Sequence, residues 1–378
     1  MSTSDDVTRQ MRNHAYATAG VDIVAGDQAV RLMQSAVLAT HDERVMGGFG
    51  GFSGLFDVSE LLTYRRPVLS MSTDGVGTKV DIAQRMDLHD GVGFDMVGMV
   101  VDDIAVCGAK PLALTDYIAC GKVVPERIAV IVGGVARACA EARTILIGGE
   151  TAEHPGHFEV DQYDLSGCAI GVVEADEILG AHRVKADDVV IGMASSGLHS
   201  NGFSLVRRAI KNAGWRLDRE IPEFGRSLGE EVLEPTRIYS PMCLDLRTEI
   251  GADLHAYAHV TGGGLAANLA RVLPRGLRAC VDRSAWDVPA VFHVIGQIAN
   301  ADWFDLEDTF NMGLGMVAVV APAAADQTLV ALAELGCQSW VVGSVKTDNS
   351  TAPSDARVVA GTKGVDGGSV ELRGNYRR

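Results

Sequence analysis

Short apolar runs alternate with longer amphipathic segments along most of this chain. Runs of roughly four to eight apolar residues predict buried strands, and longer segments with apolar positions three and four residues apart predict helices. The first half contains predicted strands at 68–72, 112–119, 144–148 and 165–173 and predicted helices at 92–108 and 125–142. The second half contains predicted strands at 188–194, 278–282 and 313–320 and predicted helices at 202–213, 262–273 and 325–336. This alternation predicts an α/β (or α+β) fold.

The pattern pauses at Glu174-Ala-Asp-Glu177, and the chain length supports a division there. A chain of 378 residues exceeds the roughly 250–300 residues at which single cores stop growing. We therefore expect an N-terminal domain over residues 1–174 and a C-terminal α/β domain over residues 175–362. Residues 363–378 are rich in glycine and charge, and we expect them to be disordered.

The segment from Ser70 to Lys79 carries the most informative chemistry. It places a carboxylate, two glycines, a hydroxyl and an ammonium within six residues, in the order Asp74, Gly75, Gly77, Thr78 and Lys79. Glycines let the backbone approach a phosphate closely, an ammonium neutralises phosphate charge, and a carboxylate binds hard cations such as Mg²⁺. The spacing is not that of a P-loop. A plain tight turn is the alternative interpretation of these residues.

The predicted helix at 92–108 has one apolar face, which is formed by Met96, Val97, Val100, Val101, Ile104 and Cys107. Asp95 and Asp102 project almost opposite that face, which predicts a solvated pair of charges. Asp103 projects at the edge of the apolar face, and a carboxylate there needs a partner. Mg²⁺ or Lys79 would serve as that partner.

Two further glycine-rich segments suggest loops around a polyanion. Residues 47–54 contain five glycines and two phenylalanines in eight positions. A mobile loop that closes over a ligand fits this composition, and a flexible linker is the alternative. Residues 148–153 form a second glycine-rich turn, which carries Glu150.

Two polar turns precede predicted helices in the second half. In the first, His199 lies between small and polar residues, where it could donate to a phosphate or transfer a proton near neutral pH. The alternative is that His199 and Asn201 cap the following helix. In the second, His259 precedes Thr261 and three glycines. The backbone N–H groups of such a turn suit a phosphate.

Composition excludes several classes of protein. The net charge of −16 argues against nucleic acid as a partner, because phosphate backbones need a basic surface. Seven cysteines without a C-x-x-C motif suggest reduced thiols in the cytosol. No apolar run reaches the ~20 residues that a bilayer span needs. The chain also lacks the G-x-G-x-x-G motif of Rossmann dehydrogenases.

Taken in order, these motifs resemble one family closely, phosphoribosylformylglycinamidine cyclo-ligase, also called aminoimidazole ribonucleotide synthetase. The resemblance covers about residues 16 to 360. It rests on the segments 19–23, 45–51, 73–79, 146–153, 197–206, 235–239, 259–264 and 309–313. One departure is Leu198, since the family usually has proline before the histidine of this turn.

The resemblance implies an enzyme that converts formylglycinamidine ribonucleotide and ATP into aminoimidazole ribonucleotide, ADP and phosphate, through an imidoyl phosphate. It implies two α/β domains, the first of which contributes strands to a barrel shared across a homodimer. The implied catalytic residues are Asp74, Lys79 and His199. The implied ATP-binding residues are Gly47, Gly48, Gly50, Gly51, Asp74, Gly75, Gly77, Thr78, Lys79, Asp103 and Glu150. The implied Mg²⁺ ligands are Asp74, Asp103 and Glu150, and the implied binders of the substrate phosphate are Ser200, Asn201, Thr261, Gly262, Gly263 and Gly264.

Other functions stay open at this point. Selenophosphate synthetase would need a cysteine near the N-terminal glycine-rich loop, and the first cysteine here is Cys107. The hydrogenase-maturation relative would end in a cysteine-bearing tail, whereas this sequence ends Asn-Tyr-Arg-Arg. Thiamine-monophosphate kinase fits the second-half motifs less well. A non-catalytic nucleotide-binding subunit is a further alternative, which a turnover assay would separate.

Overall fold

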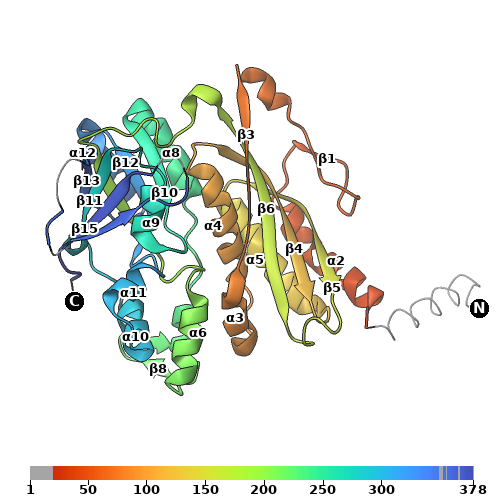
Figure 1. Ribbon diagram of the computed structural model, residues 1–378. Coiled ribbons are helices and arrows are strands. Elements are labelled where there is room, and N and C mark those ends of the chain that lie inside the picture. The colour runs from red at the N-terminus through yellow and green to blue at the C-terminus, as the bar shows by residue number, and fades with distance from the viewer. Residues whose placement is uncertain (1–19, 349–351, 355, 365–366, 378) are drawn as a thin grey trace, which may run out of the picture.

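The computed structural model describes residues 20–348, 352–354, 356–364 and 367–377, which form two large sheets, two two-stranded sheets and the helices around them (Figure 1). The strands are β1 (Val45–Met46), β2 (Leu55–Phe56), β3 (Pro67–Gly75), β4 (Lys110–Cys120), β5 (Ile145–Glu153), β6 (Tyr163–Glu174), β7 (Val189–Ala194), β8 (Glu220–Ile221), β9 (Arg226–Ser227), β10 (Leu254–His259), β11 (Leu277–Asp282), β12 (Leu314–Val320), β13 (Ser339–Thr347), β14 (Arg357–Ala360) and β15 (Ser369–Arg373). The α-helices are α2 (Ile23–Leu38), α3 (Val80–Met86), α4 (Val92–Ala105), α5 (Pro125–Glu141), α6 (Phe203–Asn212), α7 (Leu228–Val232), α8 (Ser240–Ile250), α9 (Gly264–Ala270), α10 (Ala290–Ala299), α11 (Trp303–Glu307) and α12 (Ala325–Glu334).

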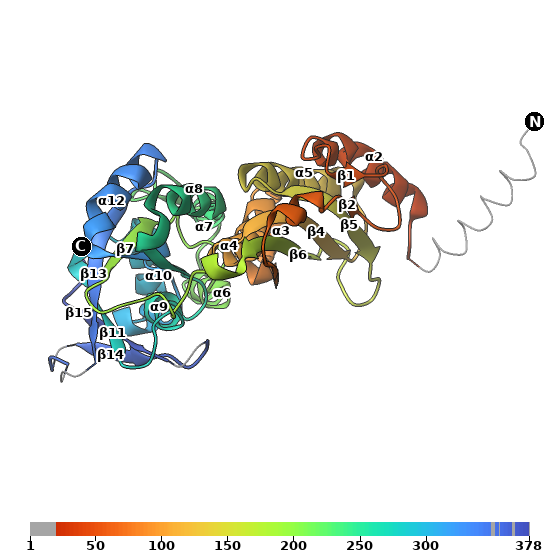
Figure 2. The same cartoon turned by 90° about the horizontal axis from the view of Figure 1, so that it is seen from above.

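The N-terminal sheet has the strand order β3-β6-β4-β5. β6 pairs antiparallel with both β3 and β4, and β4 pairs parallel with β5. Helices α4 and α5 cover one face of this sheet, and α2 packs outside α5 (Figure 2). Nothing in the described part of the chain covers the other face, on which Leu69, Met71 and Tyr117 are exposed.

The C-terminal sheet has the order β10-β12-β7-β13-β11-β15-β14. Helix α9 packs on one face, and α8 and α12 pack on the other. A smaller lobe below this sheet contains α6, α10 and α11 (Figure 1). Its apolar side chains join those of the N-terminal domain in one continuous hydrophobic cluster. The two halves therefore share buried surface.

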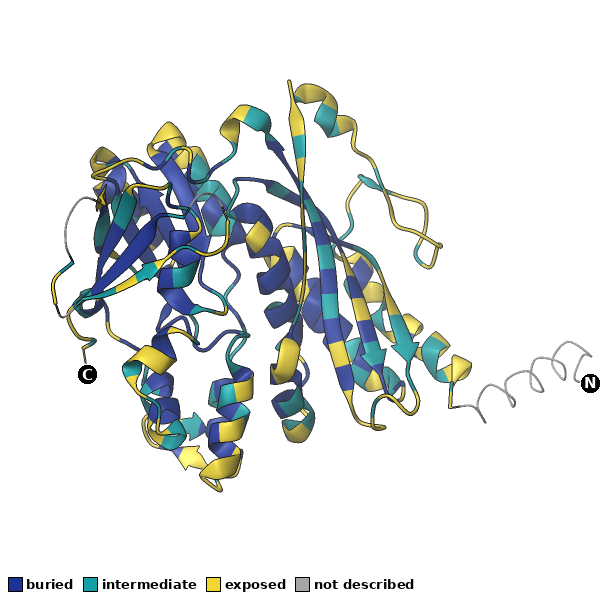
Figure 3. Cartoon of the chain, viewed as in Figure 1, coloured by how far each residue is buried: buried dark blue, intermediate teal, exposed yellow. Residues whose placement is uncertain are grey.

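Helix α4 lies between the two halves and is buried along most of its length (Figure 3). Twelve of its fourteen residues are buried, including Asp95 and Asp102, both of which are fully inaccessible. The expectation of a solvated charge pair is therefore wrong. One side of α4 packs on the N-terminal sheet, and residues 234–240 cover the side that would otherwise face water. Of the residues of α4 only Asp103 is exposed, so the helix has no broad solvated face.

The predicted strands and helices are confirmed, with ends shifted by a few residues. The expectation of disorder over 363–378 is wrong for Ser369–Arg373, which form β15. This strand pairs parallel with β11, and its Val370 and Leu372 are buried in the sheet core. The elements that were not predicted are helices α2, α3, α7, α8, α10 and α11 and strands β1, β2, β8, β9, β10, β13, β14 and β15. No helix in the described part of the chain combines the length and apolarity that a membrane crossing requires.

Close packing of α4 on α5 requires a residue without a side chain at position 93, where the chain has Gly93. A Cβ added at this glycine would lie 2.2 Å from the backbone nitrogen of Val135, so alanine would force the helices apart. We expect Gly93→Ala to lower the melting temperature by about 5 °C or more in thermal unfolding. Gly26→Ala, in an open position of helix α2, is the matched control. It should leave the melting temperature unchanged or raise it, since alanine is the better helix former; equal losses for both variants would contradict the packing argument.

Candidate active site

Two carboxylates and a histidine converge where the two halves meet. Asp74 comes from the end of β3, Asp103 from α4 and His259 from the end of β10. His259 Nδ1 donates to Asp103 Oδ1 at 2.9 Å, and its Nε2 is buried without a partner among the described residues. A buried polar atom without a partner is what a bound ligand would satisfy.

The charges within this cluster act on one another. Burial opposes the charged form of His259, but the hydrogen bond to Asp103 and the charges of Asp103, Asp102 and Asp74 outweigh burial and raise the pKa of the ring. Partial burial raises the pKa of Asp74, and the nearby charge of Asp103 raises it further, against the hydrogen bond from Gly75 N–H. Two adjacent carboxylates therefore gain from a cation placed between them.

The two polar turns of the second half reach this cluster. Ser200 Oγ donates to the Val76 carbonyl at 2.7 Å, directly after Asp74 and Gly75. Asn201 Oδ1 accepts from Gly262 N–H at 2.9 Å, so the two turns are joined to each other. The helix-cap alternative for Asn201 is not found, because Gly202 is the residue before α6 and no side chain caps that helix.

His199 lies behind these turns and is 1% exposed. Its Nε2 accepts from Ser196 N–H at 3.2 Å, while its Nδ1 has no partner among the described residues. Burial lowers the pKa of His199 well below its ordinary value, and the positive charges of His259, Lys79 and Arg237 lower it further. The ring is therefore neutral near pH 7, with its proton on Nδ1. It can act as a hydrogen-bond donor rather than as a cation.

Lys79 does not face the open side of the site. Its side chain is fully buried, and its Nζ donates to Asp95 Oδ1 at 2.7 Å, to the His199 carbonyl at 3.0 Å and to the Glu234 carbonyl at 2.7 Å. All three ammonium protons are thus used, so a phosphate contact would require one of these bonds to break. Burial lowers the pKa of Lys79 and raises that of Asp95, and each charge opposes the shift of the other.

The two buried aspartates of α4 hold the segment that follows α7. Asp95 Oδ1 accepts from the backbone N–H and hydroxyl of Thr236. Asp102 accepts from the backbone N–H groups of Tyr239 and Ser240, at the start of α8. Burial raises the pKa of Asp102 to about 7. These carboxylates therefore support the site from behind.

Glu150 and the glycines at 47–51 lie elsewhere in this chain. In the sheet register Gly75 pairs with Ser166, Ser166 with Tyr117 and Tyr117 with Glu150. Three strand spacings separate the two ends of this row by roughly 14 Å. The glycines form the tip of the β1–β2 hairpin, which packs beside β5 at Gly54 and Ile147. The expected grouping of Glu150 with Asp74 and Asp103 is therefore wrong within a single chain.

The residues present fit a magnesium ion that arrives with a nucleotide. Among the described residues, no group of three or more His, Cys, Asp or Glu side chains forms a metal site. Asp74 and Asp103 supply two carboxylates, and Mg²⁺ typically takes one or two from a protein and completes its shell with water and phosphate oxygens. Sequence reasoning missed the pairing of His259 with Asp103. The available signal was a histidine placed directly before a glycine turn, opposite a carboxylate that needed a partner.

Family models match both halves of the chain. The model described as the AIR synthase related protein, N-terminal domain, matches residues 62–173, and the corresponding C-terminal domain model matches residues 185–355. A phosphoribosylformylglycinamidine cyclo-ligase of Geobacillus sp. (strain WCH70) is 46% identical over 333 residues, which are 88% of this chain and 95% of that protein. One from Pseudothermotoga lettingae is 45% identical over 330 residues, which are 87% of this chain and 96% of that protein.

Solved structures of the same fold are more distant in sequence. Thiamine-monophosphate kinase from Stenotrophomonas maltophilia K279a has a TM-score of 0.62 at 18% identity, covering 93% of this chain and 97% of its own. Hydrogenase maturation protein HypE in complex with ATP has a TM-score of 0.59 at 19% identity, covering 84% of this chain and 86% of its own. These similarities establish the fold alone.

The two domains and the site between them define an AIR synthase related protein. Identity near 45% along almost the full length of the curated relatives then separates it from the thiamine-monophosphate kinase and hydrogenase-maturation branches. The chain belongs to the phosphoribosylformylglycinamidine cyclo-ligase family.

The buried position of Lys79 predicts a structural effect of its removal. Lys79→Met leaves the Asp95 carboxylate buried without its counter-charge, which should cost about 3–5 kcal/mol of unfolding free energy. The double variant Lys79→Met with Asp95→Asn should recover about half of that loss, because the unpaired charge is removed. Denaturant unfolding would measure both.

The matched control is Arg216→Met, which breaks the exposed pair of Arg216 and Asp218 and should cost less than about 1 kcal/mol. A Lys79→Met protein that unfolds like the wild type but needs more ATP would contradict this interpretation and restore the direct phosphate contact.

Proposed function

We propose that this protein closes the imidazole ring of aminoimidazole ribonucleotide, using ATP and formylglycinamidine ribonucleotide and releasing ADP and phosphate. The observation that carries the proposal is the convergence of Asp74, Asp103 and His259 with the two turns at 199–202 and 259–264. This arrangement offers negative charge for a nucleotide-borne cation on one side and N–H donors for a phosphate on the other. The family of the chain supplies the reaction.

The chemistry asks the protein mainly to position groups and balance charge. An amide carbonyl is a poor electrophile, and its oxygen is a poor leaving group. Transfer of the γ-phosphoryl group to that oxygen gives an imidoyl phosphate, which a nitrogen of the same molecule attacks at high effective molarity. The new C–N bond forms, the C–O bond breaks and phosphate leaves. Phosphoryl transfer of this kind depends on orientation and electrostatic stabilisation.

The residues of this chain divide these tasks. Asp74 and Asp103 would hold Mg²⁺, which neutralises nucleotide phosphate charge when it is bound. The pKa of His259 is raised, and its Nε2 has no hydrogen-bond partner among the described residues. This nitrogen would donate to phosphate oxygens beside the two carboxylates. The turn of Thr261, Gly262, Gly263 and Gly264, with Ser200 and Asn201, would cradle the 5-phosphate of the ribonucleotide. The Gly262 and Gly264 amides donate to Asn201 Oδ1 and to the Thr261 carbonyl, and they would exchange these acceptors for phosphate oxygens. The Nδ1–H of His199 would donate to the developing charge.

The separated glycine loop suggests a second copy of the chain. The uncovered face of the N-terminal sheet exposes Leu69 to 52% and Met71 to 69%, and such apolar surfaces mark interfaces. A twofold dimer through this face would form the shared barrel and remove the exposed edges. It would also allow residues 47–51 and Glu150 of one copy to serve the nucleotide at Asp74 of the other. Residues 1–174 would then be the ATP-binding and dimerisation domain, and we place this enzyme in the cytoplasm, where its seven free cysteines stay reduced.

Removal of the central carboxylate tests the catalytic proposal. Asp74→Asn should reduce turnover at least about a hundredfold, because one charge that holds the nucleotide cation is lost. The assay supplies formylglycinamidine ribonucleotide with Mg-ATP and measures the imidazole product. Asp218→Asn makes the same chemical change on the exposed surface and should retain full activity. Near-normal turnover of Asp74→Asn at saturating Mg²⁺ would exclude this role for the residue.

Light scattering tests the dimer. We expect a mass twice that of the 40.0 kDa chain at sub-micromolar concentration. Met71→Asp places a charge on the uncovered face and should give a folded monomer with little turnover, since the partner's loop is lost. Val330→Asp, at an exposed apolar position of α12, should remain dimeric and active. A wild-type protein that is monomeric and fully active would contradict the shared barrel.

A further inference from the structure

The segments after residue 356 form a strap that family models leave out. We define the strap as β14, β15 and residues 374–377. The matching domain model ends at residue 355, yet β15 is buried in the C-terminal sheet between β11 and β14. The strap is therefore part of the C-terminal sheet.

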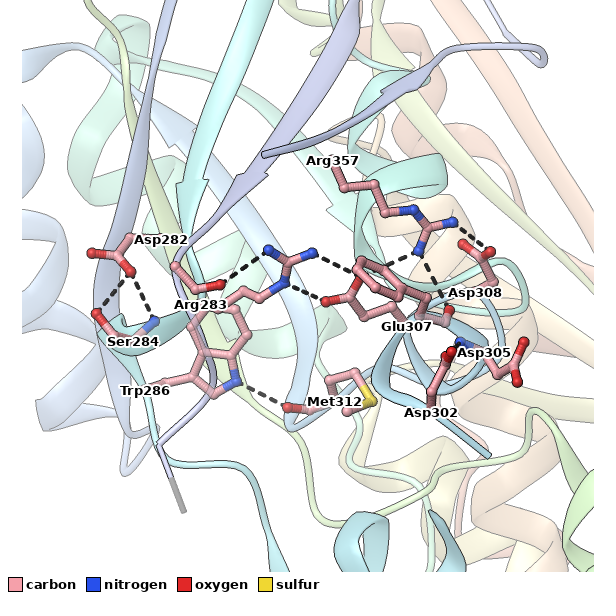
Figure 4. Close-up of polar contacts among 12 residues, drawn as sticks. Asp282, Arg283, Ser284, Trp286, Asp302, Asp305, Glu307, Asp308, Met312 and Arg357 are labelled. Carbon is pink, nitrogen blue, oxygen red and sulfur yellow. Dashed lines mark hydrogen bonds and ion pairs between the residues drawn. The ribbon is translucent and has the colours of Figure 1, made fainter. Parts of the chain in front are cut away.

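Glu307 is the point on which the strap converges (Figure 4). This carboxylate is 5% exposed and forms a bidentate pair with Arg283, whose Nη2 donates to Oε2 at 3.1 Å. Arg357, on β14 of the strap, adds a second charge: its Nη1 donates to Glu307 Oε2 at 3.2 Å and its Nη2 to Asp308 Oδ2 at 2.5 Å. Arg283 also donates to the Gly374 carbonyl of the strap at 3.2 Å.

Tyr376 of the strap contacts the same network. Its ring packs against Trp286 and Trp303, at centroid distances of 5.5 and 5.3 Å, and the Arg283 guanidinium lies over it at 5.9 Å. Burial raises the pKa of Tyr376, and the charge of Glu307 raises it further. The indole N–H of Trp286 donates to the Met312 carbonyl at 2.9 Å (Figure 4). Both ends of the segment 307–313 are thus held from the strap side.

The opposite side of this segment shapes the turns of the active site. A Cβ at Gly264 would lie 1.7 Å from the Glu307 carbonyl oxygen, and a Cβ at Gly202 would lie 2.3 Å from the Phe310 ring. Asn311 is 3% exposed, and its Nδ2 donates to the Gly197 carbonyl at 2.9 Å. A shift of Glu307 would therefore be transmitted to the 199–202 and 259–264 turns by direct contact, since close-packed interiors transmit displacement.

We infer that Arg357 and Tyr376 are positioning residues that act through Glu307 to fix the two phosphate-binding turns. The inference rests on the proposed function in assigning those turns to the ribonucleotide phosphate. Arginine suits this task because its planar fork engages two acceptors in fixed geometry. Neither residue touches substrate. Their contribution is to hold the turns at 199–202 and 259–264 in the geometry that binds phosphate.

The test compares phosphate-ligand binding with stability in the full chain. Arg357→Met should weaken binding of ribose 5-phosphate about tenfold in calorimetry. The reason is that the turns lose their pre-organised geometry and must be ordered at the expense of binding free energy. The KM for the ribonucleotide should rise by a similar factor, while the KM for ATP and the kcat should change less than about twofold. Arg357→Lys, which keeps one charge, should recover part of the binding. Tyr376→Leu provides a milder second variant if Arg357→Met does not fold.

Arg278→Met is the matched control, since it removes an arginine that pairs with Glu371 and Asp348 on the far side of β15. It should lower the melting temperature without changing ribose 5-phosphate binding. Folded Arg357→Met and Tyr376→Leu proteins with wild-type binding would overturn the positioning role, as would a wild type that does not bind ribose 5-phosphate. The proposed function fails separately, if the wild type binds ribose 5-phosphate but forms no imidazole product.

Discussion

The buried ion pair between Lys79 and Asp95 is the interaction on which the rest of this structure depends. It connects the turn after β3, helix α4, the backbone of His199 and the backbone of Glu234 through one ammonium group. A charge enclosed so completely requires all its partners in place, because the cost of leaving it unpaired exceeds that of most other contacts. The two domains are thereby fixed in one relative position, with Asp74 on one side and the phosphate turns on the other.

Helix α4 carries this arrangement because three of its carboxylates have different tasks. Asp95 and Asp102 are enclosed and bind the segment at 236–240 through backbone N–H groups. Asp103 points toward the open side, where it pairs with His259 and shares a negative environment with Asp74. The same helix thus supplies structural charge to the domain interface and chemical charge to the site. Close approach at Gly93 and Gly98 lets neighbouring backbone and Thr236 pack against it.

Sequence reasoning succeeded where the chemistry is local in the chain. The strands, the main helices and the glycine turns at 74–79, 199–202 and 259–264 follow from short-range pattern, and the structure brings these turns together. It failed where the outcome depends on remote partners. The apolar periodicity of α4 indicated a solvated side. Residues 234–240, some 140 positions away in the sequence, cover that side, and a local pattern carries no information about them. Glu150 belongs to one of the glycine-rich motifs from which the site was predicted. The strand order places its strand, β5, at the edge of the sheet opposite β3 and Asp74.

The C-terminal strap shows the same limit in another form. Its glycines and charges are typical of disorder, yet Val370 and Leu372 fill the sheet core and Arg357 meets Glu307. The overall composition of a segment does not reveal the few buried side chains that decide whether it folds. Conversely, Lys79 in a glycine turn suggested a phosphate ligand, whereas the structure makes it the connection between domains. Residue type and local spacing define what a side chain can do, and packing decides which of those tasks it performs.

Amide hydrogen exchange in the wild type and in Lys79→Met tests this account most directly. If the buried ion pair holds the site together, the variant loses protection jointly in three segments that are distant in sequence, at 74–80, 197–203 and 234–240. The outer strands β14 and β15 should keep their wild-type protection, which provides an internal reference. Loss of protection confined to 74–80, with the other two segments unchanged, would contradict the central role of this pair.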